Sequence, residues 1–373
     1  MDKMDILIEK HAPYETGKPA QKAFYDALNE CFDFHYSRND LFRKNADFFG
    51  KKCPRSDADL PAYPYLFVDL FKSRRMCSVK AREIRIRLSS SGTGGRKSYH
   101  YLDGISLSRI KRIVAKTFDD HGLVSDKRCN YLCFTYDPKV AKDVGTAFSD
   151  KLLTGLTPRA SVYYSLKFND KSGEFEFNEQ ECVELLKKYQ KSGLPLRILG
   201  FPAYLWKVLT SHHGDFSFPA DSFVITGGGW KLHTGEEVPK QVFKGMIGKK
   251  LGIAPDHIVD TYGMVEHGIP YIDCREGNFH VPIYARVLAR EPLSLSVMPY
   301  GGEGIAQLVS PYMHSFPAVS LLSTDRISMG EGCACGRKTP FFNILGRGGV
   351  KKHKGCAINA AELLARQEGR RHA

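Results

Sequence analysis

The sequence predicts an α/β protein in which a large domain, with mostly parallel sheets flanked by helices, is joined to a small β subdomain. Strand-like and helix-like segments alternate between residues 130 and 226, which is typical of a parallel sheet with helical crossovers. From about residue 278 the pattern changes to short strands. We therefore expect one main domain over residues 1–346, with the β subdomain at about 278–346, and a short C-terminal segment over 347–373.

The N-terminal elements follow from apolar periodicity. Residues 18–50 are expected to be helical with a break near Ser37, and residues 61–71, rich in proline and aromatic residues, to be a connecting loop. Strict alternation over 84–88 predicts a strand. Residues 106–120 carry apolar side chains on one helical face, and we expect the positive end of this helix to lie near any phosphate bound by the loop before it.

Later elements alternate regularly. Strands are expected at 130–135, 160–164, 196–200 and 223–226, with helices at 179–191, ending at Gly193, and around 204–211. Short strands are then expected at 280–288, 304–310 and 318–322.

Composition narrows the class of protein. With 373 residues, 42% of them hydrophobic, the chain can bury a large core. It has no apolar run long enough to span a bilayer and no signal-peptide pattern at its start, so we expect a cytoplasmic protein without a membrane span. The net charge of +13 fits either nucleic-acid binding or attraction of an anionic ligand or acidic partner. No nucleic-acid-binding motif is present, so we expect no nucleic-acid partner.

The segment Ser89–Lys97 combines four hydroxyl side chains, three glycines and two cations directly after a predicted strand. Glycines allow close approach of backbone N–H groups to an anion, hydroxyls add hydrogen-bond donors, and cations neutralise charge. The segment lacks the GxxxxGK[ST] pattern of a Walker A loop. A polyphosphate is the natural ligand, although a flexible loop without a ligand would have a similar composition.

Five further segments occur in a fixed order. They are Thr226–Lys231, Tyr262–Glu266, Ser323–Arg326, Gly346–Gly348 and Lys354–Cys356. The first four, with the Ser89–Lys97 loop, resemble the motifs of the adenylate-forming superfamily of acyl-CoA synthetases and related ligases. The last resembles the acyl-protein synthetases of bacterial bioluminescence, the LuxE family, as do Phe34–Asn39 and Tyr284–Arg286. The resemblance extends from about residue 34 to 359.

Two features depart from the superfamily pattern. Its typical members carry a further C-terminal domain with a catalytic lysine, whereas only 26 residues follow Arg347 here, so we expect that domain to be truncated. The segment Cys333–Arg337 is more similar to the phenylacetate-CoA ligase branch.

The resemblance implies roles for individual residues. It places the triphosphate at the loop and Lys97, the adenine against the glycines after residue 226 and Tyr262, Mg²⁺ at Glu266, and the ribose at Asp325 and Arg347. The implied nucleotide-binding residues are Ser89, Ser90, Ser91, Gly92, Thr93, Gly94, Gly95, Gly227, Gly228, Gly229, Tyr262, Asp325 and Arg347. Without the resemblance, the glycines would fit an ordinary strand-to-helix turn, Glu266 a surface carboxylate, and Asp325 and Arg347 structural positions.

Cys356 lies in a cationic segment, Lys351–Cys356. Nearby cations favour the thiolate form, which is the nucleophile. The resemblance implies that this cysteine becomes acylated.

A second group of residues suits a metal. Cys274, His280, Cys333 and Cys335 would make a Cys₃His set for a structural Zn²⁺ that ties the β subdomain to the main sheet. The alternative is four unlinked residues. Five other cysteines are expected to pack as small apolar side chains, namely Cys31, Cys77, Cys129, Cys133 and Cys182.

The resemblance therefore implies an ATP-dependent acyl-protein synthetase. Such an enzyme activates a carboxylic acid, by family a fatty acid, as an acyl-adenylate, forms a thioester on Cys356 and passes the acyl group to a partner reductase of the acyl-CoA-reductase type. One alternative is ligation to coenzyme A or a carrier-protein thiol. A further alternative is a zinc-stabilised basic module that binds RNA or protein.

Overall fold

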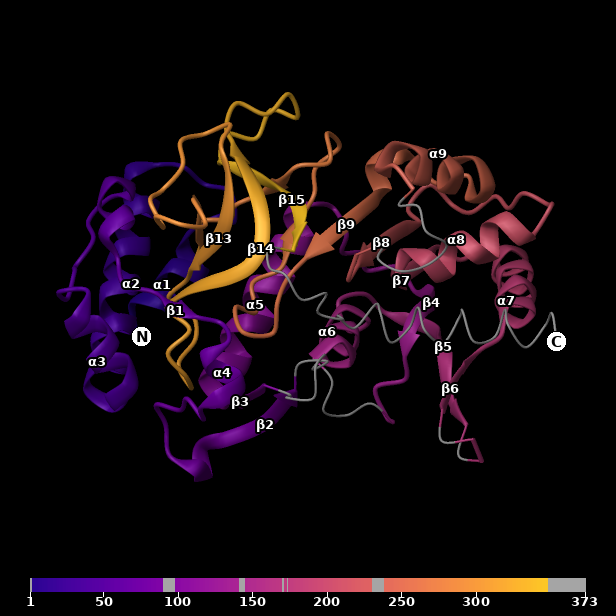
Figure 1. The fold of residues 1–373 in the computed structure, drawn as a ribbon. Coiled ribbons are helices and arrows are strands. Elements are labelled where there is room, and N and C mark those ends of the chain that lie inside the picture. The colour runs from indigo at the N-terminus through magenta and orange to yellow at the C-terminus, as the bar shows by residue number, and fades with distance from the viewer. Residues whose placement is uncertain are drawn as a thin grey trace. The chain divides into compact units, whose positions relative to one another are not determined.

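A computed structural model describes residues 2–89, 98–140, 145–169, 171–172, 174–229 and 238–347 (Figure 1). The described residues form two compact units. The first contains residues 2–89, 98–121 and 263–347, and the second contains the described part of 122–262. Among these residues, no helix combines the length and apolar character needed to cross a bilayer.

The first unit begins with helices and continues into a β-hairpin. Its helices are α1 (Lys3–Lys10), α2 (Lys18–Arg38), α3 (Asp40–Phe48), α4 (Leu70–Ser73) and α5 (Gly104–Asp120). Short 3₁₀ turns lie at Asp57–Ala62 and Ala81–Glu83. The hairpin consists of β2 (Ile84–Ser89) and β3 (Tyr99–Asp103). The expected break in the first long helical segment is confirmed, at Asn39, whose side chain accepts a hydrogen bond from the Phe42 N–H and so caps α3.

The main sheet of the first unit is largely antiparallel. Its strands are β11 (Phe279–His280), β12 (Arg286–Arg290), β13 (Glu303–Val309), β14 (Ser320–Gly330) and β15 (Phe341–Arg347), in the order β11-β15-β14-β13-β12. The predicted change to short strands after residue 278 is thus confirmed. A short strand β10 (Tyr271–Ile272) precedes them. The expected loop at 61–71 is wrong in part, because β1 (Leu66–Phe67) pairs in parallel with Leu321 and Leu322 of β14.

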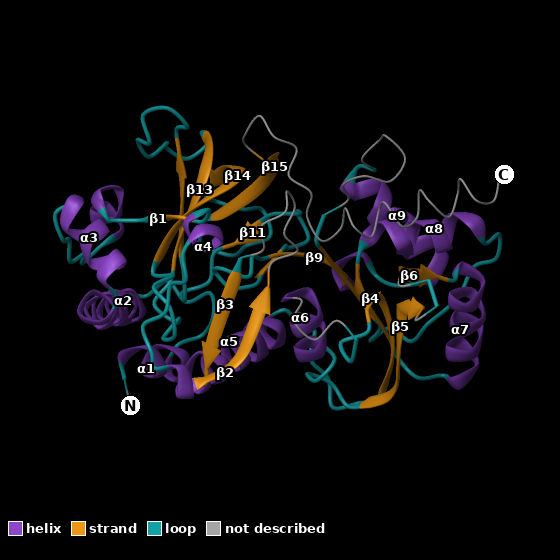
Figure 2. Cartoon of the chain, turned by 60° about the horizontal axis from the view of Figure 1, so that its bottom comes forward, coloured by secondary structure: helices purple, strands orange, loops and turns teal. Residues whose placement is uncertain are grey.

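The second unit alternates strands and helices, as the sequence predicted. Its strands are β4 (Cys129–Tyr136), β5 (Arg159–Asn169), β6 (Glu174–Phe177), β7 (Leu196–Gly200), β8 (Phe223–Gly227) and β9 (Ile258–Tyr262), and its helices are α6 (Gly145–Leu153), α7 (Glu179–Ser192), α8 (Pro202–Ser211) and α9 (Lys240–Leu251). A 3₁₀ turn lies at Pro255–His257. The strand order is β9-β8-β7-β4-β5-β6 (Figure 1), and all neighbours are parallel except β5 and β6. Figure 2 shows the helices and strands in contrasting colours.

The core of the second unit lies between this sheet and its helices. Every residue of β4 is buried, as expected for a central parallel strand covered on both faces. Leu132 and Phe134 belong to one hydrophobic cluster with side chains of α7, α8 and α9. Thr135, which points to the opposite face, donates a hydrogen bond to Asp150 of α6. The crossover helices therefore cover both faces of the sheet and leave its strand ends for a site.

Helix α5 begins at the opposite end of the β2–β3 hairpin from Ser89. Helix α5 begins after Asp103, whose carboxylate accepts a hydrogen bond from the Ser106 N–H. Asp103 pairs with Ile84, whereas Ser89 pairs with Tyr99 at the other end of the hairpin. The start of α5 and the strand ends that border the Ser89–Lys97 loop are thus separated by about 14 Å of strand. The expectation that the positive end of this helix lies near a phosphate at the loop stays a prediction, because residues 90–97 lie outside the described residues.

Candidate functional site

The structure describes some of the predicted nucleotide-binding residues and not others. Those described in the second unit are Gly227, Gly228, Gly229 and Tyr262, and those in the first unit are Ser89, Glu266, Asp325 and Arg347. Ser90, Ser91, Gly92, Thr93, Gly94, Gly95, Lys97 and Cys356 lie outside the described residues.

In the second unit, the predicted adenine-binding residues lie where two neighbouring parallel strands end. Gly227 ends β8, Tyr262 ends β9, and Gly227 is the register partner of Thr261. The Thr261 hydroxyl donates to the backbone oxygen of Thr226 at 2.8 Å and so joins the two strand ends. Ligands of open α/β sheets bind at this carboxyl edge.

The three glycines are required by the backbone at this edge. A Cβ atom at Gly227 would lie 2.6 Å from the Thr261 Oγ1, and one at Gly228 would lie 2.9 Å from the Phe201 Cε1. Gly228 and Gly229 have φ angles of +83° and +77°, which side chains disfavour. The chain therefore passes close to its neighbours here and keeps one surface bare of side chains.

In the first unit, the Ser89–Lys97 loop connects β2 and β3 of an antiparallel hairpin. Ser89 is buried and pairs with Tyr99, so the two strand ends that carry the loop are held together by the ladder. The hairpin register therefore places Ser89 and Tyr99 opposite each other at the end of the ladder.

Glu266 is buried, which excludes the alternative of a surface carboxylate. The Ser98 hydroxyl donates to its Oε1 at 3.2 Å, and the His100 Nε2 lies 3.4 Å from the same oxygen. Burial alone raises the pKa of Glu266, but the hydrogen bond and charge of His100, with the Ser98 hydroxyl, outweigh burial and hold the pKa below its usual value. Glu266 is therefore a buried, ionised carboxylate.

Ser98 and His100 were not singled out from the sequence. Ser98 directly precedes β3 and His100 belongs to it, and both are buried, whereas Tyr99 between them is exposed. The His100 ring packs between Phe71 and Phe316, with ring centroids 5.7 and 5.4 Å away. The alternation of side chains along a strand indicates that Ser98 and His100 share one face of β3. The sequence does not show what that face contacts, because Glu266 is 168 residues away from Ser98.

Asp325 and Arg347, the expected ribose-binding residues, are directly opposite each other in the β14–β15 ladder. The ladder shifts register between Arg326 and Ile327, and such irregularities often re-aim side chains near sites. The fold thus brings together two residues that are 22 positions apart in the chain.

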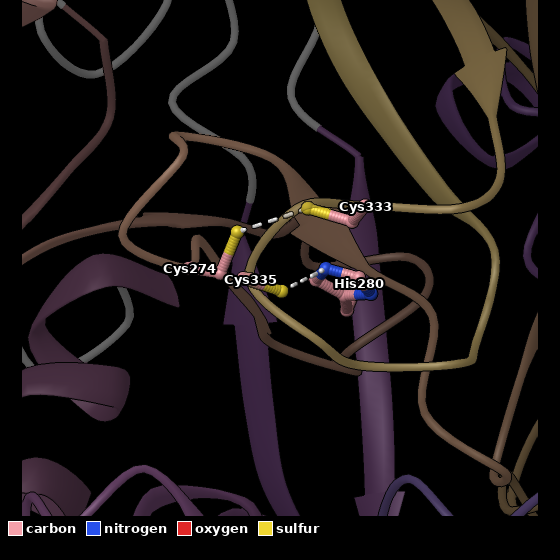
Figure 3. Close-up of side chains that lie close together, drawn as sticks. All are labelled: Cys274, His280, Cys333 and Cys335. Atoms are coloured by element: carbon pink, nitrogen blue, oxygen red, sulfur yellow. Dashed lines mark hydrogen bonds between the residues drawn. The ribbon is translucent and has the colours of Figure 1, made fainter.

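The four predicted metal-ligand residues also lie together, as Figure 3 shows. Their ligand atoms are all within 4.8 Å of one another. The Sγ atoms of Cys274 and Cys333 are 3.7 Å apart, and the Cys335 Sγ lies 3.2 Å from the His280 Nε2. Thiolates around one tetrahedral Zn²⁺ lie about 3.8 Å apart, because each Zn–S bond is about 2.3 Å long. The cluster therefore has nearly the dimensions of a zinc site.

Neighbouring groups orient these four side chains. The His280 Nδ1 lies 3.1 Å from the Thr339 carbonyl oxygen, so Nδ1 carries the proton and Nε2 presents its lone pair to the sulfurs. The Asn278 Nδ2 donates to the Cys333 Sγ at 3.2 Å. Burial raises the pKa of the Cys274 thiol to about 12 and lowers the pKa of His280. A neutral imidazole suits metal binding, whereas a buried Cys274 thiolate needs a cation nearby.

The cluster joins two turns of the first unit. Cys274 and His280 flank the turn before β11, and Cys333 and Cys335 lie in the connection between β14 and β15. All four residues lie in the first unit, and the expectation that the cluster ties the β subdomain to the main sheet stays a prediction. Of the other cysteines, the expected burial is confirmed for Cys31, Cys129, Cys133 and Cys182, whereas Cys77 is half-buried.

A comparison with protein families distinguishes an enzyme from a binding module. Residues 2–365 match the family described as "Acyl-protein synthetase, LuxE". The chain belongs to this family. A synthetase joins two molecules at the expense of ATP, so this LuxE-family protein is an ATP-dependent ligase. The alternative of a binding module without enzymatic activity is thereby excluded.

Curated relatives agree with the family. The chain is 23% identical over 373 residues to a "Long-chain-fatty-acid--luciferin-component ligase" of Vibrio harveyi, covering 98% of this chain and 95% of the relative. It is also 23% identical to the protein of the same name from Aliivibrio fischeri, covering 97% of this chain and 94% of the relative.

Solved structures of adenylate-forming ligases share the fold. 2-Hydroxyisobutyryl-CoA ligase, in the postadenylation state with R3-HIB-AMP, matches 90% of this chain and 69% of its own with a TM-score of 0.65 at 13% identity. An open form of that ligase with 2-HIB-AMP and CoA matches 90% of this chain and 76% of its own, with a TM-score of 0.65 at 14% identity. At such identities the likeness concerns the fold, and it confirms the predicted fold class.

Proposed function

We propose that the protein activates a long-chain fatty acid with ATP and transfers the acyl group to its own Cys356. Membership of the acyl-protein synthetase family over residues 2–365 carries this proposal. The names of the relatives support a long-chain fatty acid as the substrate. We assign adenylation to residues 1–346 and the acyl acceptor to the segment 347–373.

The proposed reaction has two steps. A carboxylate oxygen of the acid attacks the α-phosphorus of ATP, the bond to the β-phosphate oxygen breaks, and an acyl-adenylate and pyrophosphate form. The Cys356 thiolate then attacks the acyl carbon, and AMP leaves as a thioester forms. Positioning and electrostatic stabilisation supply most of the acceleration in phosphoryl-group chemistry of this kind.

The described residues support this assignment in three places. The bare strand edge at Gly227–Gly229, with Tyr262 on the neighbouring strand, fits a flat base. The Asp325–Arg347 pair fits the ribose hydroxyls and the α-phosphate. We assign the triphosphate to Ser89–Gly95 and Lys97.

A magnesium ion fits the donor chemistry at Glu266. Mg²⁺ prefers carboxylate and phosphate oxygens and keeps several waters. Glu266 is buried and ionised, and Ser98 and His100 hold one of its oxygens. When bound, Mg²⁺ would neutralise charge on the phosphates during acyl-adenylate formation.

We further propose one structural Zn²⁺ at Cys274, His280, Cys333 and Cys335. Four protein ligands make a closed site, which is typical of structural zinc, whereas catalytic zinc keeps an open position. The spacing of the sulfurs and the hydrogen bond from His280 to Thr339 support this assignment.

The final acceptor is proposed to be another protein. The relatives are named luciferin-component ligases, which supports delivery of the acyl group to a reductase of the acyl-CoA-reductase type. Neither a membrane nor a nucleic acid is needed for this reaction.

The adenylation step is tested by acid-dependent release of pyrophosphate from ATP and Mg²⁺, across fatty acids of increasing length and a set of aryl acids. The wild type is expected to release pyrophosphate best with a long-chain acid, and Asp325→Ala to raise the KM for ATP. Glu303→Ala, on the neighbouring strand and ion-paired with the exposed Arg326, is the matched control and should leave that KM unchanged. Absence of acid-dependent release by the wild type would refute the proposal.

A further inference from the structure

We propose that Ser98 and His100 are positioning residues that hold the Glu266 carboxylate in the orientation that binds the Mg²⁺ of ATP. The inference rests on the proposed function, in which Glu266 is the Mg²⁺ ligand. No motif assigned a role to either residue. All three lie in the first unit.

Three polar atoms form a closed triangle. The His100 Nε2 lies 2.9 Å from the Ser98 Oγ and 3.4 Å from the Glu266 Oε1, and the Ser98 Oγ lies 3.2 Å from the same Oε1. The single proton of the Ser98 hydroxyl is donated to the Glu266 Oε1, so this hydroxyl accepts from the His100 ring, which carries its proton on Nε2. Rotation of the Glu266 carboxylate would break both contacts at once.

The triangle is fixed to the phosphate loop. Ser98 directly follows Lys97, and His100 is the register partner of Leu88 in the hairpin that carries the loop. The His100 ring is 1% exposed and packs between two phenylalanine rings. Because Ser98 and His100 contact Glu266, its carboxylate is held at a fixed position relative to strands β2 and β3.

A comparison with another buried histidine of the same unit indicates that His100 does more than fill space. Both ring nitrogens of His35 are satisfied, Nδ1 by the Ser78 Oγ at 2.7 Å and Nε2 by the Met313 carbonyl oxygen at 2.9 Å. The His100 Nδ1 is buried without a hydrogen-bond partner in the described part of the chain. An unsatisfied buried nitrogen destabilises the fold, and the Nδ1 of His267 in the same unit is in the same state. What distinguishes His100 is therefore the contact of its other nitrogen with the Ser98 hydroxyl and the Glu266 carboxylate.

The test measures metal affinity apart from turnover. Mn²⁺, a paramagnetic substitute for Mg²⁺ at oxygen ligands, is titrated into the purified full-length protein with ATP, and free Mn²⁺ is followed by electron paramagnetic resonance. His100→Leu is expected to weaken Mn²⁺ binding by about 10- to 100-fold, the usual effect of losing an outer-shell partner. His100→Gln, whose amide nitrogen can reach the position of Nε2, should recover most of the affinity. Ser98→Ala should weaken binding several-fold.

His35→Leu is the matched control for the loss of a buried histidine. It should lower the thermal midpoint while leaving Mn²⁺ affinity unchanged. Unchanged affinity in folded His100→Leu, or in Ser98→Ala should His100→Leu fail to fold, would overturn the inference. A failure of the proposed function would look different: the wild type would show neither ATP-dependent Mn²⁺ binding nor acid-dependent pyrophosphate release. That result would overturn both the proposed function and this inference.

Discussion

Removing one sulfur from the Cys₃His cluster should destabilise the first unit. We choose Cys333→Ser, because the Cys333 Sγ contacts the Cys274 Sγ and accepts a hydrogen bond from Asn278. The exposed Cys53 provides the matched control, Cys53→Ser, with the same chemical change away from the cluster.

The expected magnitude follows from the chain length that the cluster closes. Cys274 and Cys333 are separated by 59 residues, and a cross-link that closes a loop of this length stabilises the folded state by about 4 kcal/mol in the chain-entropy treatment. For a unit of about 200 residues, such a loss lowers the melting temperature by roughly 8–16 °C. Metal chelation of the wild type should have a similar effect, since a metal bound to the folded state stabilises it.

Two measurements check this prediction. Elemental analysis of protein purified without added metal should give one zinc per chain in the wild type and in Cys53→Ser, and much less in Cys333→Ser. Thermal unfolding should show the drop only for Cys333→Ser and for chelated wild type. A wild type that carries no zinc even after equilibration with it, and whose melting temperature is indifferent to chelator, would refute the reasoning.

Two further predictions concern the second unit. Gly228→Ala should lower the free energy of unfolding in urea by about 2–4 kcal/mol, because strain at positive φ adds to a clash with Phe201. Gly229→Ala has the same strain but open space around the new Cβ, so it should lower the free energy of unfolding by only about 1–2 kcal/mol. Equal losses for the two variants would contradict the account of this turn. Burial raises the pKa of Asp150 from 3.8 to about 7, so the folded state keeps a proton that the unfolded chain has released, and stability falls as pH rises through this range. Asp150→Asn should therefore raise the melting temperature at pH 8 relative to wild type, with the difference shrinking toward pH 4 and below; a pH-independent difference would contradict that assignment.

Local signals in the sequence were sufficient for most elements of the second unit. Helix α7 shows why: Asn178 accepts a hydrogen bond from the Glu181 N–H at its start, and Gly193, with φ of +66°, ends it. These interactions span only a few residues, so their chemistry is visible in the sequence. Strand β1 is the opposite case. Its two residues pair with β14, which is more than 250 positions away, and nothing within 61–71 indicates that pairing.

The candidate sites divide in the same way. The Cys₃His residues were found because few side chains bind zinc and their types restrict the choice, even across 59 residues. Asp325 and Arg347 were singled out through their motifs, and only the β14–β15 register shows that they are paired positions of one ladder. Ser98 and His100 carried no motif, and their role depends on a contact with Glu266 that only the folded chain makes. The start of α5 was predictable from the sequence, because its cap, from the Asp103 carboxylate to the Ser106 N–H, spans only three residues.

The central claim is that this LuxE-family protein acylates itself at Cys356. The most direct measurement is the intact mass of the wild type and of Cys356→Ser after incubation with ATP, Mg²⁺ and a panel of fatty and aryl acids. The account predicts a mass increase equal to one acyl group in the wild type with a long-chain acid, removed by hydroxylamine and absent from Cys356→Ser. Acid-dependent pyrophosphate release without any adduct in the wild type, or an equal adduct in Cys356→Ser, would contradict it.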